Sequence, residues 1–308
     1  MYKMSFDPFE NKPDIAASSR HLYTHNLRKL NNNKEIKNLN FLSKPEILER
    51  LEGLNPNTKR TYIIAIVSSL RDRPEAKYKK LYDKFYKMLL KINAELKNNT
   101  TKSEKQKENW ISQEEVIKKY NELAEVIAEI KGRRRISEEK YTQLLNAVVL
   151  GLYCLQPPRR NKDYTNCFVV KKVPGDTERN YLDIKEWEWV FNNYKTKKTY
   201  KQVKLDVPDE LEDLLKVYFQ YHPFAKEMKK KSFDPVPLLM TQDGKVIDTS
   251  TEMTRMLNKI FGKKIGSSLL RNIFLTDKYK DTKEELEEDA KAMGTSSSTA
   301  NTNYIKTE

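Results

Sequence analysis

Residues 97–109, KNNTTKSEKQKEN, contain no apolar side chain and separate two segments that each carry periodic apolar positions. A single hydrophobic core cannot run through such a stretch, because burial of apolar surface is what stabilises a core. The chain has 308 residues, which is enough for two domains of ordinary size. We therefore predict two domains, joined by a basic linker over residues 98–109.

The segment before the linker is rich in helical patterns. Apolar residues recur at helical spacing in stretches near 43–53, 56–70 and 75–97, which places them on one face of each helix. These stretches predict a small helical domain over residues 38–97. Residues 1–37 are polar and rich in Asn and show no sustained period, so we expect them to form a flexible arm.

The segment after the linker, residues 110–308, predicts a second domain that is mainly helical. An amphipathic helix follows Trp110, and a longer apolar helix ends at Pro157 and Pro158, because proline lacks a backbone donor and clashes with the preceding turn. Four short segments between these prolines and Pro208 are rich in β-branched and aromatic residues, which predicts a small antiparallel sheet. The expected fold class is therefore mainly α, with an α-rich second domain that carries this sheet.

The net charge of the chain is strongly positive. Lys and Arg number 58 against 44 Asp and Glu, which gives a formal charge of +14. This balance predicts a phosphate-rich partner, with nucleic acid first, although a Lys-rich protein from an AT-rich genome has the same composition. The candidate phosphate contacts, which are solvated surface charges on the plainer interpretation, are Lys102, Lys105, Lys107, Arg133, Arg134, Arg135 and Lys197.

The sequence lacks the motifs of nucleotide or metal chemistry. It contains no Walker-type glycine loop, HExxH, GxSxG or DxD pair, so we expect neither a cofactor nor a metal. Cys154 and Cys167 lack the spacing of a zinc site and are too few for a disulfide framework, which favours an intracellular protein with reduced thiols. No window of the sequence predicts a membrane span.

Three short basic segments are candidates for a functional site. PPRRNKDY carries Arg159 and Arg160, NNYKTKKTYK forms a Lys-rich hairpin tip, and KKIGSSLLRNIF embeds Arg271 among apolar residues. Two guanidiniums at a proline-bounded helix end suit an anion, because arginine offers planar, permanently charged donors. Each segment also has a plainer interpretation: arginines paired with Asp163, solvated lysines, and an Arg271 that reaches water along its aliphatic stem.

Taken in order, these segments resemble the tyrosine recombinase (phage integrase) family over residues 40–308. Arg160, in an Arg-x-x-Asp setting, resembles the first arginine motif of the family, and Ser268-Leu269-Leu270-Arg271-Asn272 resembles its second box. Met293-Gly294-Thr295-Ser296-Ser297, followed by Tyr304, resembles the last signature. Within the family, recombinases of large DNA viruses and of their virophages or transposon-like satellites look most similar.

The resemblance implies a site-specific recombinase or integrase that cuts and rejoins DNA through a 3′-phosphotyrosyl intermediate, without metal or ATP. Tyr304 would be the nucleophile, and Arg160 and Arg271 would bind the scissile phosphate. Lys195, or Lys198 as second choice, would protonate the leaving oxygen. The remaining candidates would donate neutral hydrogen bonds (Ser268 and Thr295) or support the site (Arg159 and Asn272). Asp163, one helical turn past Arg160, would orient that arginine.

The resemblance also implies domain roles, partners and a location. The helical domain over 38–97 would be the core-binding domain and residues 110–308 the catalytic domain, and the two would close as a clamp around double-stranded DNA. The protein would be a monomer off DNA and a homo-tetramer on paired sites, without contact to a membrane. It would act in the cytoplasm or nucleus of a host cell or be carried in a virion.

Three positions depart from the family pattern. Ser268 stands where relatives usually have His or Lys, Thr295 where they have His or Trp, and Asn272 directly follows the second arginine. These side chains can donate a hydrogen bond but cannot carry a positive charge near neutral pH. Two alternatives stay open: a type IB topoisomerase, which uses the same tyrosine chemistry as a monomer, and a catalytically degenerate DNA-binding relative.

Overall fold

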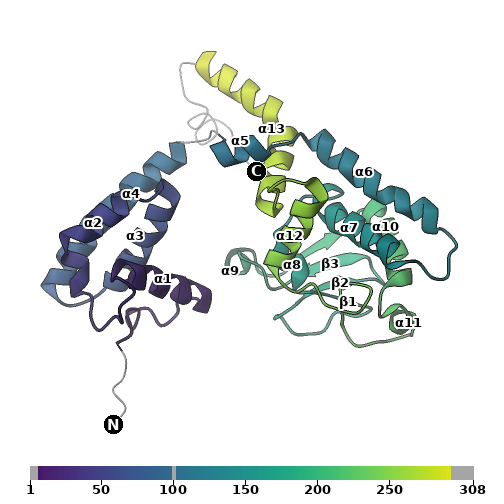
Figure 1. Cartoon of the computed structure of the whole chain (residues 1–308), viewed down its shortest axis with the longest axis horizontal. Coiled ribbons are helices and arrows are strands. Elements are labelled where there is room, and N and C mark those ends of the chain that lie inside the picture. The colour runs from purple at the N-terminus through teal and green to yellow at the C-terminus, as the bar shows by residue number, and fades with distance from the viewer. Residues whose placement is uncertain (1–5, 99–101, 293–308) are drawn as a thin grey trace, which may run out of the picture. The chain divides into compact units, whose positions relative to one another are not determined.

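The computed structural model describes residues 6–98 and 102–292 of the chain (Figure 1). The described residues divide into two units, which fall within residues 1–101 and 102–308. Helices dominate both units, and a five-stranded sheet lies in the second. The predicted fold class, mainly α with a small sheet, is confirmed.

The first unit is built from helices alone in its described part. Its elements are α1 (Ala17–Leu30), the 3-10 turn η1 (Asn40–Ser43), α2 (Pro45–Glu52), α3 (Pro56–Leu70) and α4 (Ala76–Asn98). The last three confirm the helices predicted from the apolar spacing. Oδ1 of Asn55 accepts the backbone N–H of Thr58 at 2.9 Å, and this satisfies one of the free donors at the start of α3.

The prediction of a flexible arm over residues 1–37 is wrong for its described part, residues 6–37. Helix α1 lies within it, and Phe9 and Leu27 are completely buried in the core of the first unit. Arg73 also holds the segment, because its Nη1 lies 2.8 Å from Oε1 of Glu10. The apolar residues of α1 that face the core, Tyr23, Leu27 and Leu30, form a pattern of only about two turns, and α3 packs against this face.

The segment predicted as a linker contains a helix of the second unit. Helix α5 (Glu104–Asn109) begins with a capping box, in which Ser103 and Gln106 exchange hydrogen bonds between side chain and backbone. Asn109 is buried, and its Oδ1 accepts the backbone N–H of Lys264 at 2.9 Å. This segment has no apolar side chain to bury in a core. Polar side chains form the helix instead: Ser103 and Gln106 cap its start, and Asn109 bonds its end to Lys264.

Two longer helices, α6 (Gln113–Ile130) and α7 (Glu138–Cys154), follow α5. The predicted start of α6 is confirmed: Oγ of Ser112 accepts the N–H of Glu115 at 3.0 Å, and Oε2 of Glu115 accepts the N–H of Ser112 at 2.7 Å. Helix α7 ends just before the double proline, as predicted.

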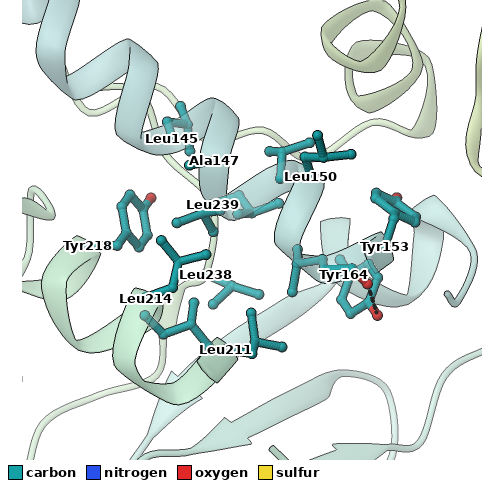
Figure 2. Packing of buried hydrophobic residues seen from close by; sticks show 14 of the residues in the cluster. Leu145, Ala147, Leu150, Tyr153, Tyr164, Leu211, Leu214, Tyr218, Leu238 and Leu239 are labelled. Atoms are coloured by element: carbon teal, nitrogen blue, oxygen red, sulfur yellow. Dashed lines mark hydrogen bonds between the residues drawn. The ribbon is translucent and has the colours of Figure 1, made fainter. Parts of the chain in front are cut away.

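Helix α7 runs through the core of the second unit (Figure 2). Leu145 and Leu150 of α7 are buried in the same cluster as Leu214 of α10 (Asp209–Tyr221). A Cβ atom on Gly151 would lie only 2.8 Å from Cδ2 of Leu214. The absence of a side chain at Gly151 therefore lets α7 and α10 approach closely.

The sheet of the second unit is mixed, with the strand order β4-β3-β2-β1-β5. Its strands are β1 (Cys167–Val170), β2 (Asn180–Asp183), β3 (Glu188–Phe191), β4 (Val203–Asp206) and β5 (Val236–Pro237). The expectation of a wholly antiparallel sheet is corrected at one pair, because β1 and β2 are parallel. Residue patterns indicate a strand but not its direction, and the connection over residues 171–179 is long enough to return the chain to the start of β2.

The remaining helices of the second unit are α8 (Asn161–Thr165), α9 (Lys197–Tyr200), α11 (Ala225–Met228), α12 (Ser250–Phe261) and α13 (Ser267–Ala292). Helix α8 directly follows the double proline, and α9 is a single turn in the connection between β3 and β4. Within residues 6–98 and 102–292, no helix combines the length and the apolar character needed to cross a membrane.

Candidate functional site

A pocket of about 410 Å³ brings together segments that are far apart in the sequence. It lies where the end of α7, the start of α8, the β3–β4 region and α13 meet. The residues that line it are Gln156, Pro157, Pro158, Arg159, Arg160, Asp163, Phe191, Tyr194, Thr196, Tyr200, Val203, Leu205, Asp206, Pro208 and Arg271. The two arginine segments predicted as candidates thus share one pocket.

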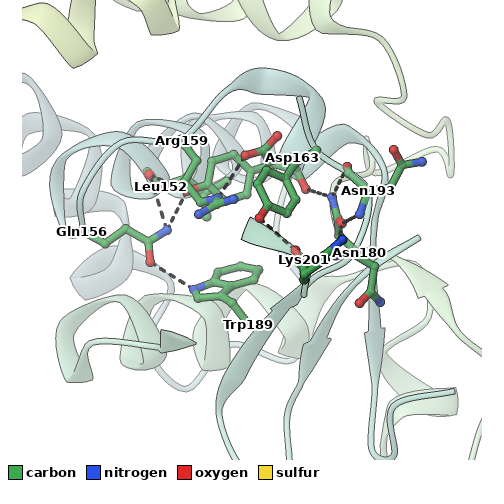
Figure 3. Close-up of polar contacts among 11 residues, drawn as sticks. Leu152, Gln156, Arg159, Asp163, Asn180, Trp189, Asn193 and Lys201 are labelled. Carbon is green, nitrogen blue, oxygen red and sulfur yellow. Dashed lines mark hydrogen bonds and ion pairs between the residues drawn. The ribbon is translucent and has the colours of Figure 1, made fainter. Parts of the chain in front are cut away.

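Arg159 is held in the wall of this pocket (Figure 3). Its Nε lies 3.0 Å from Oδ2 of Asp163, and its guanidinium carbon lies 3.8 Å from the ring centroid of Phe191 and 5.2 Å from that of Tyr194. The ion pair with a carboxylate and the contact with the aromatic rings hold this guanidinium in one position. Arg159 therefore has a structural part in the pocket wall.

The expectation that Asp163 orients Arg160 is wrong. Arg160 is the N-cap residue of α8, and the carboxylate of Asp163 pairs instead with Arg159, four residues earlier. Sequence spacing could not decide this, because adjacent arginines at a helix start point their side chains in different directions and both lie within reach of the same carboxylate.

Asp163 is buried, with 3% of its side chain exposed. Burial raises the pKa of its carboxyl above the ordinary value, and the positive charge of Arg159 opposes this shift. Oδ1 of Asp163 has no hydrogen-bond partner among the described residues. The carboxylate thus depends on Arg159 as its main charge partner.

Arg160 and Arg271 carry the free positive charge of the pocket. Within the described residues, no carboxylate lies within ion-pairing distance of either guanidinium. Burial lowers the pKa of Arg271, and the nearby charge of Arg160 lowers it further. Asp206 also lines the pocket, but it is exposed on β4. Asp163 attracts Arg271 from a greater distance. Two partly buried guanidiniums that repel each other and have no carboxylate within ion-pairing distance suit an anion with several oxygen atoms.

Gln156 connects the end of α7 to the sheet beneath the pocket. Its Oε1 accepts the indole N–H of Trp189 at 3.0 Å, and its Nε2 donates to the hydroxyl of Tyr164 at 2.8 Å (Figure 3). Trp189 lies in β3 and is buried. The arginine-bearing corner after α7 is therefore fixed to the strand that leads into the Lys-rich loop.

The predicted Lys-rich hairpin is confirmed as the connection between the antiparallel strands β3 and β4. Tyr194, Thr196 and Tyr200 of this connection line the pocket, but its lysines do not. Lys195 and Lys198 are exposed, and Lys197 is half-buried. The structure thus brings the loop to the arginines without bringing a lysine side chain into the pocket.

Two further candidates lie on α13 beside Arg271. Ser268 is exposed in the first turn of the helix, one turn before Arg271, and Asn272 is exposed directly after it. Neither side chain lines the pocket. Thr295 and Tyr304 lie outside the described residues.

The candidate phosphate contacts away from the pocket lie on the surface. This position fits a contact to phosphate and equally a solvated surface charge. Lys107 pairs with Glu104 at 2.7 Å, and Nζ of Lys102 lies 3.7 Å from the ring centroid of Trp110. The others are exposed on α5 and in the turn between α6 and α7: Lys105, Arg133, Arg134 and Arg135. None of them lines the arginine pocket.

Sequence reasoning missed the aromatic wall of the pocket. Phe191 and Tyr194 contact Arg159, and the hydroxyl of Tyr194 donates to the backbone oxygen of Lys201 at 2.9 Å. The available signal was a pair of tyrosines, Tyr194 and Tyr200, on either side of the lysine run. In the described part of the chain, no group of His, Cys, Asp and Glu side chains is arranged to hold a metal ion.

Comparison of the chain with protein-family models, curated proteins and solved structures gives no match.

Proposed function

We propose that this protein breaks and rejoins DNA through a covalent tyrosine intermediate, as a site-specific recombinase or integrase. The observation that carries the proposal is the meeting of Arg160 and Arg271 in one pocket, each without a carboxylate partner among the described residues. A DNA phosphodiester is the ligand that both the pocket charge and the net charge of +14 favour.

The proposed reaction is a transesterification at phosphorus. The Tyr304 hydroxyl loses its proton to water, and its oxygen forms a bond to phosphorus while the bond from phosphorus to the 5′-oxygen of the DNA breaks. Arg160 and Arg271 would bind the nonbridging oxygens, on which negative charge increases in the transition state. Rejoining reverses these steps, so the phosphodiester energy is retained and no nucleotide is consumed.

The leaving 5′-oxygen requires a proton, and the Lys-rich loop carries the groups proposed to supply it. Lys195 or Lys198 would act as the general acid. Because the tyrosines of the same loop line the pocket, a small rearrangement of this loop on DNA would bring a lysine to the leaving oxygen. Strand exchange between two duplexes would then require paired sites, for which we propose a homo-tetramer.

A second candidate function is DNA binding without catalysis. It is favoured by the exposed position of Ser268 and by a pocket lining without lysine or histidine. On this alternative the arginines would bind a backbone phosphate and the loop would add surface charge.

Covalent capture tests the proposal and separates the two candidates. The purified chain is incubated with EDTA and a randomised library of nicked DNA duplexes, and protein–DNA adducts that resist SDS are counted. Tyr304→Phe removes the proposed nucleophile, and Tyr279→Phe is the matched control, because Tyr279 is an exposed tyrosine on α13. DNA binding is measured on the same samples.

An adduct that forms with the wild type and Tyr279→Phe but not with Tyr304→Phe supports the proposal. Intact DNA binding without any adduct contradicts it and favours the non-catalytic alternative. An adduct that survives in Tyr304→Phe would show that another residue is the nucleophile.

A further inference from the structure

Asn180, the first residue of β2, lies completely buried between the arginine corner and the Lys-rich loop. We propose that Asn180 is a positioning residue, whose side chain holds the β3–β4 loop at a set distance from the arginine pocket. The inference rests on the function proposed above for that pocket, and it assigns to the site a residue whose side chain is fully buried.

The side-chain amide of Asn180 makes all the hydrogen bonds that it can make. Its Nδ2 donates to the backbone oxygen of Asp163 at 2.8 Å and to that of Asn193 at 3.1 Å. Its Oδ1 accepts the backbone N–H of Asn192 at 2.9 Å and that of Asn193 at 2.7 Å. Figure 3 shows Asn180 between Asp163 and Asn193.

These bonds join two parts of the pocket. Asp163 pairs with Arg159 and lies one helical turn after Arg160. Asn192 and Asn193 directly precede Tyr194, the first residue of the loop that lines the pocket. A change in the side chain of Asn180 would therefore shift the loop relative to the arginines.

The loop is also tied at its far end. Oδ1 of Asn192 accepts from Nε2 of Gln202 at 2.7 Å, and Nδ2 of Asn192 donates to the backbone oxygen of Arg179 at 3.1 Å. Because Gln202 follows the loop and Asn192 precedes it, the two ends are held together next to Asn180. Between these ends, Tyr194 is buried and its hydroxyl donates to the backbone oxygen of Lys201 at 2.9 Å, whereas the candidate general acids Lys195 and Lys198 are exposed.

Only asparagine satisfies this arrangement, because it combines two donors and an acceptor oxygen on a short side chain. Aspartate has the same size but cannot donate when ionised, so its carboxylate would face the backbone oxygens of Asp163 and Asn193. An apolar residue would leave buried backbone groups without partners.

The test compares Asn180→Asp with Asn166→Asp. Asn166 is the matched control, because its side chain makes one peripheral bond, to the backbone oxygen of Glu178 at 3.0 Å. Two quantities are measured on each folded protein: the rate of adduct formation in a single turnover, and the rate at which trypsin cleaves after the lysines of residues 195–201. The dissociation constant for DNA is measured alongside.

In Asn180→Asp we expect adduct formation to slow by about 10²-fold, the effect of misplacing a reacting group by roughly 1 Å, with unchanged DNA affinity. Trypsin should cleave the loop faster than in the wild type and in Asn166→Asp. Unchanged adduct and trypsin rates would overturn the inference and leave the proposed function standing. If the wild type forms no adduct but trypsin cleaves the loop of Asn180→Asp faster than that of the wild type, the role of Asn180 as the loop anchor is supported and the proposed function is contradicted.

Hydrogen exchange tests the same inference on the wild-type protein, so the result does not depend on whether the Asn180→Asp variant folds. The amides of Asn192 and Asn193 lie beyond the strand ladder of β3 and are bonded to Asn180. They should exchange as slowly as the amides of β3. Exchange as fast as that of the exposed loop residues would overturn the inference.

Discussion

The guanidinium of Arg159 lies 3.0 Å from the carboxylate of Asp163, measured from Nε to Oδ2, and this contact leaves the neighbouring Arg160 free of a carboxylate partner within the described residues. Two adjacent arginines thus have different tasks. Arg159 neutralises a buried acid and stacks on Phe191, whereas Arg160 contributes its charge to the pocket with Arg271. This division makes the two arginines separable by mutation.

Replacing Arg159 by Ala should destabilise the second unit. The substitution leaves the buried Asp163 without its charge partner, which costs about 3 kcal/mol in the free energy of unfolding. Arg160→Ala should cost much less, because Arg160 has no such partner among the described residues. Urea unfolding followed by tryptophan fluorescence measures this, since Trp110, Trp187 and Trp189 all lie in the second unit. Equal destabilisation by both variants would contradict the assignment.

Replacing Arg160 or Arg271 should instead affect chemistry. Loss of one preorganised donor to the transition state lowers rates by about 10²–10³-fold, so adduct formation should fall by that factor in Arg160→Ala and in Arg271→Ala. The unfolding midpoint in urea should change little for Arg160→Ala. Arg255→Ala, an exposed arginine on α12, is the control and should retain the wild-type rate. A normal rate in either pocket variant would exclude that arginine from the reaction.

Inorganic phosphate should stabilise the second unit by binding at the pocket. At ten times its dissociation constant, an anion that binds only the folded state adds about 1.4 kcal/mol of stability, which raises the unfolding temperature by about 4 °C. Sodium chloride at the same ionic strength serves as the control. The double variant Arg160→Ala, Arg271→Ala should lose the increase. A rise of the same size in the double variant would place the phosphate elsewhere.

Acid should destabilise the second unit through His222. Burial lowers the pKa of His222 to about 4, and the side chain contacts the backbone oxygen of Pro237 and the N–H of Phe224. The unfolded chain takes up a proton at the ordinary histidine pKa near 6.5, so between about pH 6.5 and 4 it binds more protons than the folded chain. Stability therefore falls as pH falls through this window, by about 3 kcal/mol in total.

The measurement for His222 is urea unfolding, followed by tryptophan fluorescence at pH 7 and pH 5. His222→Gln should lower stability at both values but reduce the difference between them. His21→Gln, which replaces an exposed histidine of the first unit, should retain the wild-type difference. If His222→Gln also retains it, other groups cause the acid sensitivity.

Replacing Phe9 by Ala should destabilise the first unit, because Phe9 is fully buried against its core. Truncation of a buried phenylalanine costs about 3–5 kcal/mol. Leu22→Ala, at a residue that is 45% exposed on α1, should change stability much less. Far-UV circular dichroism of a fragment ending at residue 98 would follow the unfolding, provided that wild-type fragment shows a cooperative transition. Equal effects of both substitutions would contradict the folded position of residues 6–37.

Apolar spacing determined most of the helices correctly, because it reports which face of a segment is buried. α2, α3, α4, α6 and α7 each carry enough apolar residues at helical spacing to be recognised alone. α1 was missed because its core-facing residues at helical spacing, Tyr23, Leu27 and Leu30, span only about two turns, which is too short a pattern to recognise alone. α5 was missed because it has no apolar residue, and its start depends on Ser103 and Gln106.

The site was predicted in part. Arg159, Arg160, Asp163 and Arg271 were identified as candidates and lie at one pocket. The lysines of the loop were identified too, but the structure brings Tyr194 and Tyr200 to the pocket instead. Asn180 could not be found from the sequence, because its partners are backbone groups of residues 163, 192 and 193, and backbone groups leave no sign in the residue pattern.

The sequence by itself determined where most of the helices and strands form and that the chain carries a large excess of positive charge, since both depend on local residue types. Only the tertiary structure decided which arginine forms the ion pair with Asp163, that Arg271 and Arg160 line the same pocket, and that β1 lies parallel to β2. The physical reason is that these relationships depend on the direction of side chains and on contacts between distant segments. Such contacts form only when the core around α7 closes.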